Sequence, residues 1–474
     1  MTELHKMMAF FGVAREDLLR LIQIALSNGG DYADLYFEHS ISNEIALRDG
    51  EVNAAGSHID YGMGIRVVYG DQTGYAYTEI TTMKEMEKAA KAASQIATSS
   101  IKEMPPIRIN PLKFTNFYPI ITSWEENPIS SKIPFLRNMN SKIFALDSRV
   151  NKVLAKISDS TTLILFFNSD GLLAFDERPM ASIAATCIME SDGKVENSSS
   201  SRSFRTGFEF LTDDLVNEVA KEVVERTAFL FNAIQPKGGE LPVVMGAGGS
   251  GILLHEAIGH AFEADFNRLN TSIFADKFGK TICSSEISVI DDGTIPGNRG
   301  SVNFDDEGVI GQKTYMVRDG VLTSYLHDRI SAGYYKTAPT GNGRRESFRF
   351  MPLPRMRATY MENGSSSETD IISSVKKGIY VDNFSNGQVQ IGAGDFTFYV
   401  KSGYLIENGK LTRPIKDINI IGNGPQALAD IVAVGNNSVI DNGTWTCGKE
   451  QYCAVSCGMP TVLVKKLTVG GVQS

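Results

Sequence analysis

A strand-turn-helix stretch in residues 241–268 constrains this chain more than any other part of it. Leu241 to Met245 predicts a buried β-strand, a glycine-rich turn follows, and the next residues predict a helix that carries His255, Glu256 and His260. Two imidazoles that flank a carboxylate are the composition of a metal-hydrolase site, in which neutral imidazoles hold Zn²⁺ and a carboxylate takes the proton of the bound water.

The spacing of the two histidines requires a distorted helix. Positions five apart on a regular α-helix differ by about 140° around the axis, whereas positions four apart differ by only about 40°. His255 and His260 therefore cannot share a face of an undistorted helix. A one-residue π-bulge would bring them together, and Gly259 relaxes the backbone where such a bulge could form. We predict a wide turn between His255 and His260.

Two other interpretations of the stretch are weaker. A buried histidine is more often a hydrogen-bonded core residue than a metal ligand, but here two of only six histidines lie five apart with a glutamate between them. Gly246 to Gly251 fits the dinucleotide pattern G-x-G-x-x-G, which should lead to a second parallel strand. The polar residues Asn267 to Ser272 stand there instead, so we assign the glycines to close backbone packing over the site.

Composition limits the class of protein. The chain has 474 residues, of which 42% are hydrophobic and 21% charged, as in soluble globular proteins of more than one domain. No apolar run is long enough to span a membrane, and the N-terminus does not resemble a secretory signal. Five unevenly spread cysteines favour a reducing cytoplasm, and a net charge of −9 argues against nucleic acid as the main partner.

The order of predicted elements indicates an α+β fold with two domains. Residues 1–236 alternate helix and strand signals and predict a mixed α/β domain, in which 34–39 and 43–48 are separate strands and Thr212 caps a long amphipathic helix. Residues 237–474 predict a mainly antiparallel β domain that carries the metal-binding helix.

The prediction of an antiparallel β domain rests on residues that favour tight turns. Asp291-Asp292-Gly293, Arg318-Asp319-Gly320 and Glu407-Asn408-Gly409 each predict a β-hairpin. Gln426 to Val434 predicts a short helix between strands.

A catalytic zinc needs a third protein ligand besides the two histidines. Glu263, three residues after His260, could be that ligand, a partner that fixes the tautomer of His260, or a solvated carboxylate. The remaining candidates are His327 and three cysteines near the C-terminus, Cys447, Cys453 and Cys457. Spacing alone leaves these alternatives open.

The chain resembles the TldD/PmbA family of metalloproteases, historically labelled modulators of DNA gyrase. The resemblance covers nearly all of residues 240–474 and is carried by several motifs: His255-Glu256-Ala257-Ile258-Gly259-His260, Glu263, Asp265-Phe266-Asn267-Arg268, Asp305-Asp306-Glu307-Gly308, Thr340-Gly341-Asn342-Gly343-Arg344-Arg345-Glu346, Asp441-Asn442-Gly443, Cys447-Gly448-Lys449-Glu450 and Leu467-Thr468-Val469-Gly470-Gly471.

The resemblance implies one zinc ion per chain, bound by His255, His260 and Cys447, with Glu256 as the catalytic residue. It places the chain in the active TldD-like branch, because the PmbA-like branch has lost this motif. The implied activity is hydrolysis of peptide bonds in small or unfolded polypeptides. The implied assembly is a homodimer, or a heterodimer with a PmbA-like chain, that excludes folded proteins.

Residues beyond the ligands complete the expected mechanism. A thiolate ligand weakens zinc as a Lewis acid, so Arg344 or Arg345 is a candidate to stabilise the oxyanion; the alternative for both is a surface ion pair with Glu346. Two rival functions remain. The first is a zinc deaminase, but this sequence lacks the P-C-x-x-C half of the deaminase signature. A regulatory or scaffolding protein with a structural metal would not need Glu256.

Overall fold

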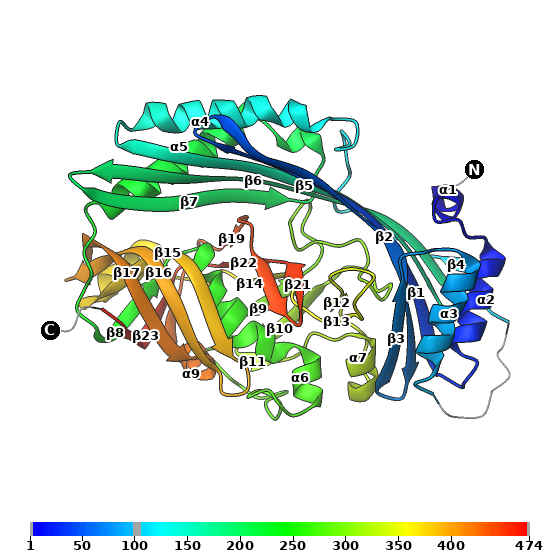
Figure 1. The fold of residues 1–474 in the computed structure, drawn as a ribbon. Coiled ribbons are helices and arrows are strands. Elements are labelled where there is room, and N and C mark those ends of the chain that lie inside the picture. Colours follow the sequence, from blue (N-terminus) through cyan, green and yellow to red (C-terminus); the bar gives the residue numbers. More distant parts are fainter. Residues whose placement is uncertain (1–2, 98–105, 472–474) are drawn as a thin grey trace.

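The computed structural model describes residues 3–97 and 106–471. One long, mainly antiparallel sheet organises the first half of the chain, in the order β3-β2-β1-β5-β6-β4, with β7 also paired to β6. Its strands are β1 (Tyr32–Arg48), β2 (Glu51–Tyr69), β3 (Gln72–Thr78), β4 (Asn110–Pro111), β5 (Val150–Asn168), β6 (Leu172–Ser191) and β7 (Lys194–Phe204). In Figure 1 these strands arch over the C-terminal half.

Two separate groups of helices cover this sheet. α1 (Glu3–Phe10), α2 (Arg15–Ala25) and α3 (Met83–Ser94) pack on one end, while α4 (Ile133–Leu146) and α5 (Asp213–Leu230) pack on the other (Figure 1). Each group buries its own apolar cluster, since the sheet is too long for one helical layer to cover. Thr212 caps α5 as predicted, accepting a hydrogen bond from the Leu215 amide.

The predicted break in the first sheet strand is wrong. Residues 34–39 and 43–48 belong to the single strand β1, which pairs without interruption to β5 on one side and runs along β2 on the other. Ser40, Ile41 and Ser42, which lie between the two predicted strands, are held in the ladder by both neighbours. Backbone pairing on two sides outweighs the local polar signal.

Two six-stranded sheets form the C-terminal half. The first has the order β17-β16-β15-β8-β23-β18 and comprises β8 (Gly239–Met245), β15 (Lys377–Gln390), β16 (Asp395–Glu407), β17 (Lys410–Asn423), β18 (Ile431–Val434) and β23 (Val462–Val469). The second has the order β11-β10-β9-β14-β22-β19 and comprises β9 (Val289–Asp292), β10 (Lys313–Arg318), β11 (Val321–Leu322), β14 (Ala358–Met361), β19 (Val439–Asp441) and β22 (Ser456–Met459).

Short elements complete the C-terminal half. They are the two-stranded pairs β12 (Gly343–Arg344) with β13 (Leu353–Pro354) and β20 (Thr446–Lys449) with β21 (Gln451–Ala454), and the helices α6 (Ala264–Arg268), α7 (Arg329–Tyr335), α8 (Glu368–Ser374) and α9 (Gly424–Ala429). The α+β class is confirmed, and the C-terminal strands are mainly antiparallel, with parallel pairing of β8 to β15 and of β14 to β22. The boundary at 236/237 falls between α5 and β8 and stays a prediction.

The turn signals of the C-terminal half are only partly correct. Hairpins form at 318–321 and at 407–410 as predicted. The signal at 291–293 ends β9, but the antiparallel partner β10 begins only at Lys313, so no hairpin forms there. The helix predicted for Gln426 to Val434 is also wrong beyond Ala429, because Ile431 to Val434 pair with β23 as strand β18.

Buried ion pairs join the long sheet to the C-terminal half. Arg66 of β2 donates to Asp34 of β1 at 2.8 Å and 2.5 Å and to Glu307 at 2.6 Å. Arg178 of β6 donates to Asp306 at 2.5 Å. Asp306 and Glu307 therefore hold the two halves together through charge-assisted hydrogen bonds.

Within the described residues, no helix has both the length and the apolar character needed to cross a membrane.

Candidate metal centre

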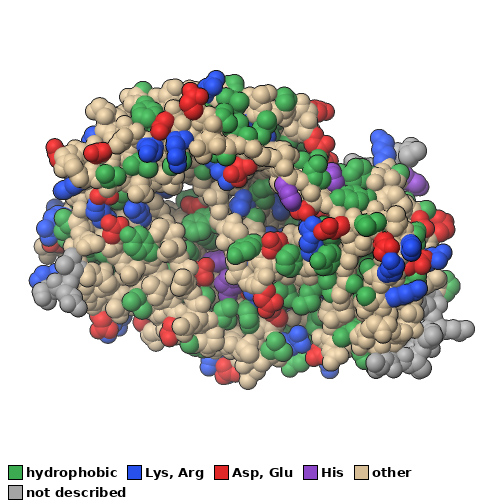
Figure 2. Space-filling model, viewed as in Figure 1, with side chains coloured by type: hydrophobic (Ala, Val, Ile, Leu, Met, Phe, Trp, Pro, Cys, Tyr) green, Lys and Arg blue, Asp and Glu red, His purple; other side chains and the backbone are tan. Residues whose placement is uncertain are grey.

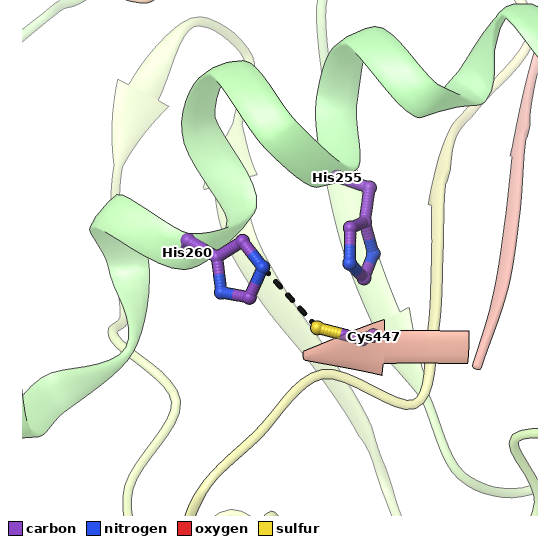
Figure 3. A group of neighbouring side chains, drawn as sticks. All are labelled: His255, His260 and Cys447. Carbon is purple, nitrogen blue, oxygen red and sulfur yellow. Dashed lines mark hydrogen bonds between the residues drawn. The ribbon is translucent and has the colours of Figure 1, made fainter. Parts of the chain in front are cut away.

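The segment that carries the two histidines is a π-helix. It spans Leu253–Gly259 and continues directly into a 3₁₀ turn at His260–Phe262. This wide turn confirms the predicted distortion. The rings of His255 and His260 lie on the same side of the segment with their centroids 5.1 Å apart (Figure 3). A regular helix would have turned them away from each other.

Two glycines allow the segment to pack closely against neighbouring strands. A Cβ atom at Gly259 would lie 2.2 Å from Sδ of Met356, and one at Gly251 would lie 2.3 Å from the backbone nitrogen of Gly458 in β22. Neither position has room for a side chain. The glycines of the 246–251 turn thus serve backbone packing at Gly251, in agreement with the interpretation preferred over nucleotide binding.

Cys447 comes to the histidines from the far end of the sequence. It lies in β20, and its Sγ is 3.2 Å from Nε2 of His260 (Figure 3). One ligand atom from each of His255, His260 and Cys447 lies within 4.8 Å of the others. All three side chains are buried, with 4 to 5% of each residue exposed. We call these three residues the triad.

The triad fits a zinc ion in its donor chemistry and its spacing. Zn–N bonds near 2.0 Å and Zn–S bonds near 2.3 Å place tetrahedral ligand atoms about 3.3 to 3.6 Å apart. The sulfur and imidazole nitrogens of the triad match this spacing within the freedom of their rotamers. Nδ1 of His255 is buried without a hydrogen-bond partner among the described residues, so protein hydrogen bonds do not occupy both nitrogens of this ring.

The pKa values of all three triad side chains are shifted toward their charged forms. Burial alone would raise the pKa of the Cys447 thiol, but the charge of His255 and hydrogen bonds to both rings lower it to about 4. Burial opposes protonation of the imidazoles, yet Cys447 raises the pKa of His255, and Glu263 raises that of His260 well above its usual range. The sulfur is therefore a thiolate at neutral pH, the form that binds metals.

A buried carboxylate supports His260 from behind. Oε2 of Glu263 lies 3.0 Å from Nδ1 of His260, leaving Nε2 to face Cys447. Glu263 is fully buried, so the alternative of a solvated carboxylate is wrong. Burial would raise the pKa of Glu263, but Lys449 and His260 lower it to about 2. The contact has the geometry of a carboxylate that orients a metal-binding imidazole.

Two cations complete this support. Nζ of Lys449 lies 3.0 Å from Glu263 and 2.8 Å from Asp265. Arg355 is fully buried, with Nε 3.7 Å from Glu263 and with hydrogen bonds of 2.9 Å to the carbonyls of Cys447 and Gln451. Arg355 thus ties both strands of the β20–β21 hairpin to the carboxylate behind His260.

Glu256 lies between the two histidines but does not belong to the triad. Its side chain is half-buried, and no other described residue forms a hydrogen bond or ion pair with its carboxylate. Its charge contributes to the raised pKa of His255. A positioned glutamate is one of the side chains that serve as general bases.

The other candidate residues lie elsewhere. Of the described residues, only the triad forms a group of three potential metal ligands, and it excludes His327, Cys453 and Cys457. Burial lowers the pKa of His327 to about 4. Cys453 lies opposite Cys447 across the hairpin, and Cys457 lies in β22.

Arg344 and Arg345 are buried rather than exposed. Arg344 donates to the carbonyls of Met356 and Ala454, and Arg345 donates to the carbonyl of Asp306. Within the described part of the chain, no ion pair joins either arginine to Glu346, so the surface ion pair considered as an alternative is wrong.

The supporting roles of Lys449 and Arg355 are absent from the predictions made from the sequence. Lys449 had a usable signal, because residues two apart in a strand share a face and Cys447 lies two before it. Arg355 had none, since its partners at 263, 447 and 451 are far away in the sequence.

Comparisons with known proteins define the class first. Three metallopeptidase domain models match in succession: PmbA/TldA metallopeptidase domain 1 at residues 33–97, the central domain at 123–228 and the C-terminal domain at 238–471. The chain thus has the domain content of a metallopeptidase. More particularly, it belongs to the PmbA/TldD family.

Individual relatives agree with this assignment. The chain is 37% identical to the metalloprotease TldD homolog of Haemophilus influenzae, over 97% of each chain. It is 28% identical to the zinc metalloprotease TldD homolog of Saccharolobus solfataricus, over 96% of this chain and 100% of that one. The crystal structure of TldE from Thermococcus kodakarensis has the same fold, with a TM-score of 0.74 at 20% identity, over 96% of this chain and 100% of that one.

Proposed function

We propose that this chain is a zinc-dependent peptidase that hydrolyses peptide bonds in small or unfolded polypeptides. The convergence of His255, His260 and Cys447, with Glu256 next to His255 in the sequence, carries the proposal. Three protein ligands leave one position open, as in catalytic rather than structural zinc sites. The zinc metalloprotease name of one relative agrees with this choice of metal. We propose one zinc ion per chain.

The chain's own residues perform the proton transfers in this proposal. Zinc held by the triad would lower the pKa of water toward about 7 and polarise a peptide carbonyl. Glu256 would accept the proton of the attacking water and donate it to the leaving amine. Burial of the triad restricts access, which favours extended or short substrates over folded proteins.

Loss of the Glu263 carboxylate is expected to weaken zinc binding. Glu263→Gln keeps the shape of the side chain but removes the charge that orients His260, so we expect zinc affinity to fall by about 10- to 100-fold. Competition with a chromophoric chelator measures this change. Asp265→Asn is the matched control, because it removes a partner of Lys449 without contacting His260 and should leave zinc affinity near that of the parent. Equal affinities in all three proteins would contradict the role of Glu263.

Zinc binding is expected to release protons at pH 7. The pKa of His255 and of His260 is raised, whereas both imidazoles must be neutral to bind metal, so roughly one to two protons should leave per zinc. Zinc affinity should therefore rise with pH until the imidazoles are fully deprotonated. Cys447 contributes little, because its pKa is already about 4. Calorimetry of chelator-treated protein in two buffers of different ionisation enthalpy measures the release, and identical heats would contradict it.

Product analysis tests the peptidase proposal directly. A mixture of unfolded peptides is incubated with zinc-restored protein, with chelator-treated protein and with zinc alone, and the products are identified by mass spectrometry. We expect new termini only with the zinc-restored protein. A tightly folded protein added to the same mixture should remain intact.

We also propose the dimeric assembly and cytoplasmic location implied by the family resemblance, with either a second copy or a PmbA-like chain as the partner. Native mass spectrometry of the purified chain, alone and mixed with a PmbA-like protein, distinguishes the two assemblies. A monomer in both samples would contradict them.

A further inference from the structure

A basic cavity lies between the long sheet and the C-terminal half. It has a volume of about 440 Å³, and its walls include β1, β5, β6, the segment 344–350 and Tyr452 to Ala454 of β21. Figure 2 shows a hollow beneath the arching sheet in which basic and histidine side chains are visible. The cavity adjoins the hairpin that carries Cys447.

Half of the arginines that line this cavity have carboxylate partners. Six arginines line it in all: Arg178, Arg205, Arg344, Arg345, Arg349 and Arg357. Arg178 pairs with Asp176 and Asp306, Arg345 lies 3.6 Å from Asp34, and Arg349 pairs with Asp60 and Glu79. The other three form no ion pair with any described residue. We call Arg205, Arg344 and Arg357 the arginine cluster.

The arginine cluster is buried and its hydrogen bonding is incomplete. The three residues are 9%, 6% and 3% exposed, in the order Arg205, Arg344 and Arg357. Nε of Arg205 and Nη2 of Arg357 have no acceptor among the described residues. The hydrogen bonds that the cluster does make go to backbone carbonyls, which carry no full negative charge.

The cluster members also repel one another. Burial and the charge of Arg344 lower the pKa of Arg357 to about 9, although the charges of Asp305 and Asp306 oppose the shift. Burial also lowers the pKa of Arg205, and the charges of Arg178 and Arg344 contribute, although Tyr118 and Asp176 oppose the shift. Buried, mutually repelling guanidinium groups are costly unless an anion compensates them.

None of the four carboxylates that line the cavity forms an ion pair with the arginine cluster among the described residues. They are Glu38, Asp60, Asp306 and Glu346. Asp60 and Asp306 already pair with other arginines. Glu346 accepts a hydrogen bond from the Tyr452 amide, and burial raises the pKa of Glu38 to about 8, which leaves it largely neutral at pH 7. The cavity therefore has a net positive charge and enough volume to hold a group of opposite charge.

We propose that the arginine cluster binds a carboxylate of the peptide substrate, either its C-terminal carboxylate or an acidic side chain. This inference rests on the proposed peptidase function. A guanidinium group matches a carboxylate with two parallel hydrogen bonds, and the cavity holds a side chain or chain end rather than a bare ion. The cluster would anchor one end of the substrate while another part reaches the triad.

The hairpin β20–β21 connects the two sites. Nη2 of Arg344 donates to the Ala454 carbonyl at 2.8 Å, and Cys453, which also lines the cavity, pairs with Cys447 across the hairpin. Paired strands lie about 4.8 Å apart, and an extended peptide advances about 3.3 Å per residue. A bound carboxylate therefore lies within a few substrate residues of the triad.

Binding measurements on zinc-loaded Glu256→Gln protein test the anchor, because this variant is expected to bind peptide without cleaving it. Three unstructured fluorescent peptides are compared: one with a free C-terminus and no acidic residue, the same peptide amidated, and the amidated peptide with one internal Glu. We expect amidation to weaken binding by about 10- to 100-fold. Recovery by the internal Glu would identify an acidic side chain as a second source of the carboxylate, and no recovery would restrict the site to the chain end.

Two cluster variants and one control complete the test. Arg205→Gln and Arg357→Gln, each in the Glu256→Gln background, should abolish the difference between the free and amidated peptides. Arg413→Gln removes an exposed arginine outside the cavity, so the difference in binding between the free and amidated peptides should remain. Using two cluster positions keeps the test decisive if one variant fails to fold. A preference that survives both substitutions, or equal binding of all three peptides, would overturn the anchor.

The parent protein separates this inference from the proposed function. Cleavage by the parent without any dependence on a carboxylate would refute the anchor and keep the peptidase. Carboxylate-dependent binding with no cleavage by the zinc-loaded parent would support the anion site and refute the peptidase.

Discussion

Glu256→Gln is expected to lower peptide hydrolysis by about 10²- to 10⁴-fold, the range typical of general acid–base catalysis, while zinc content stays at the parent level. Glutamine occupies the same volume but cannot accept a proton. The carboxylate has no hydrogen-bond partner or ion pair among the described residues, so its loss should leave the fold intact. Comparison of kcat/KM on one defined peptide, with metal analysis of the same samples, measures both quantities.

Glu240→Gln is a suitable control for this experiment. Glu240 is an exposed residue of β8 whose side chain forms a surface ion pair with Lys466, and its substitution should leave hydrolysis unchanged. Undiminished hydrolysis in Glu256→Gln would remove Glu256 from the mechanism. Lost hydrolysis with unchanged cellular behaviour would favour a scaffolding role for the protein.

Cys447→Ser is expected to reduce zinc affinity by more than about 100-fold, beyond the loss that follows removal of a supporting residue. The substitution replaces a thiolate, whose pKa of about 4 ensures its charge at neutral pH, with a hydroxyl that remains protonated. Hydrolysis should disappear with the metal. Zinc content after dialysis against a weak chelator measures the effect.

Cys453→Ser and Cys457→Ser are matched controls for the ligand. Both cysteines are buried and close in sequence to Cys447, but neither belongs to the triad. Both variants should retain zinc. Full zinc occupancy in Cys447→Ser would refute the proposed ligand set, and loss in Cys453→Ser would transfer the role to the residue across the hairpin.

Much of the metal-binding segment was predictable because its constraint is local. The five-residue spacing of His255 and His260 is incompatible with a regular helix, so the π-helix follows from geometry and the presence of Gly259. The strand before it and the capped helix α5 follow equally from periodicity and end signals. Cys447, by contrast, was singled out by family resemblance, since spacing left several ligands open.

Elements that depend on distant partners could not be predicted in this way. Ile431 to Val434 has an apolar pattern that suits a helix or a strand, and its pairing with β23 decides the outcome. The continuous β1 depends on β5, which lies more than a hundred residues later. The arginine cluster likewise combines positions from both halves of the chain, and no single segment of the sequence indicates that these positions lie close together.

During synthesis from the N-terminus, the two histidines of the triad are made well before the cysteine. The cysteine of the triad follows His260 by 187 residues, and β8, which leads into the π-helix, receives its antiparallel neighbour only from β23, the last strand. A chain still on the ribosome carries both histidines without the sulfur or the strand that position them. The metal centre of the proposed function can therefore form only after residue 447 has been synthesised, 187 residues after the second histidine.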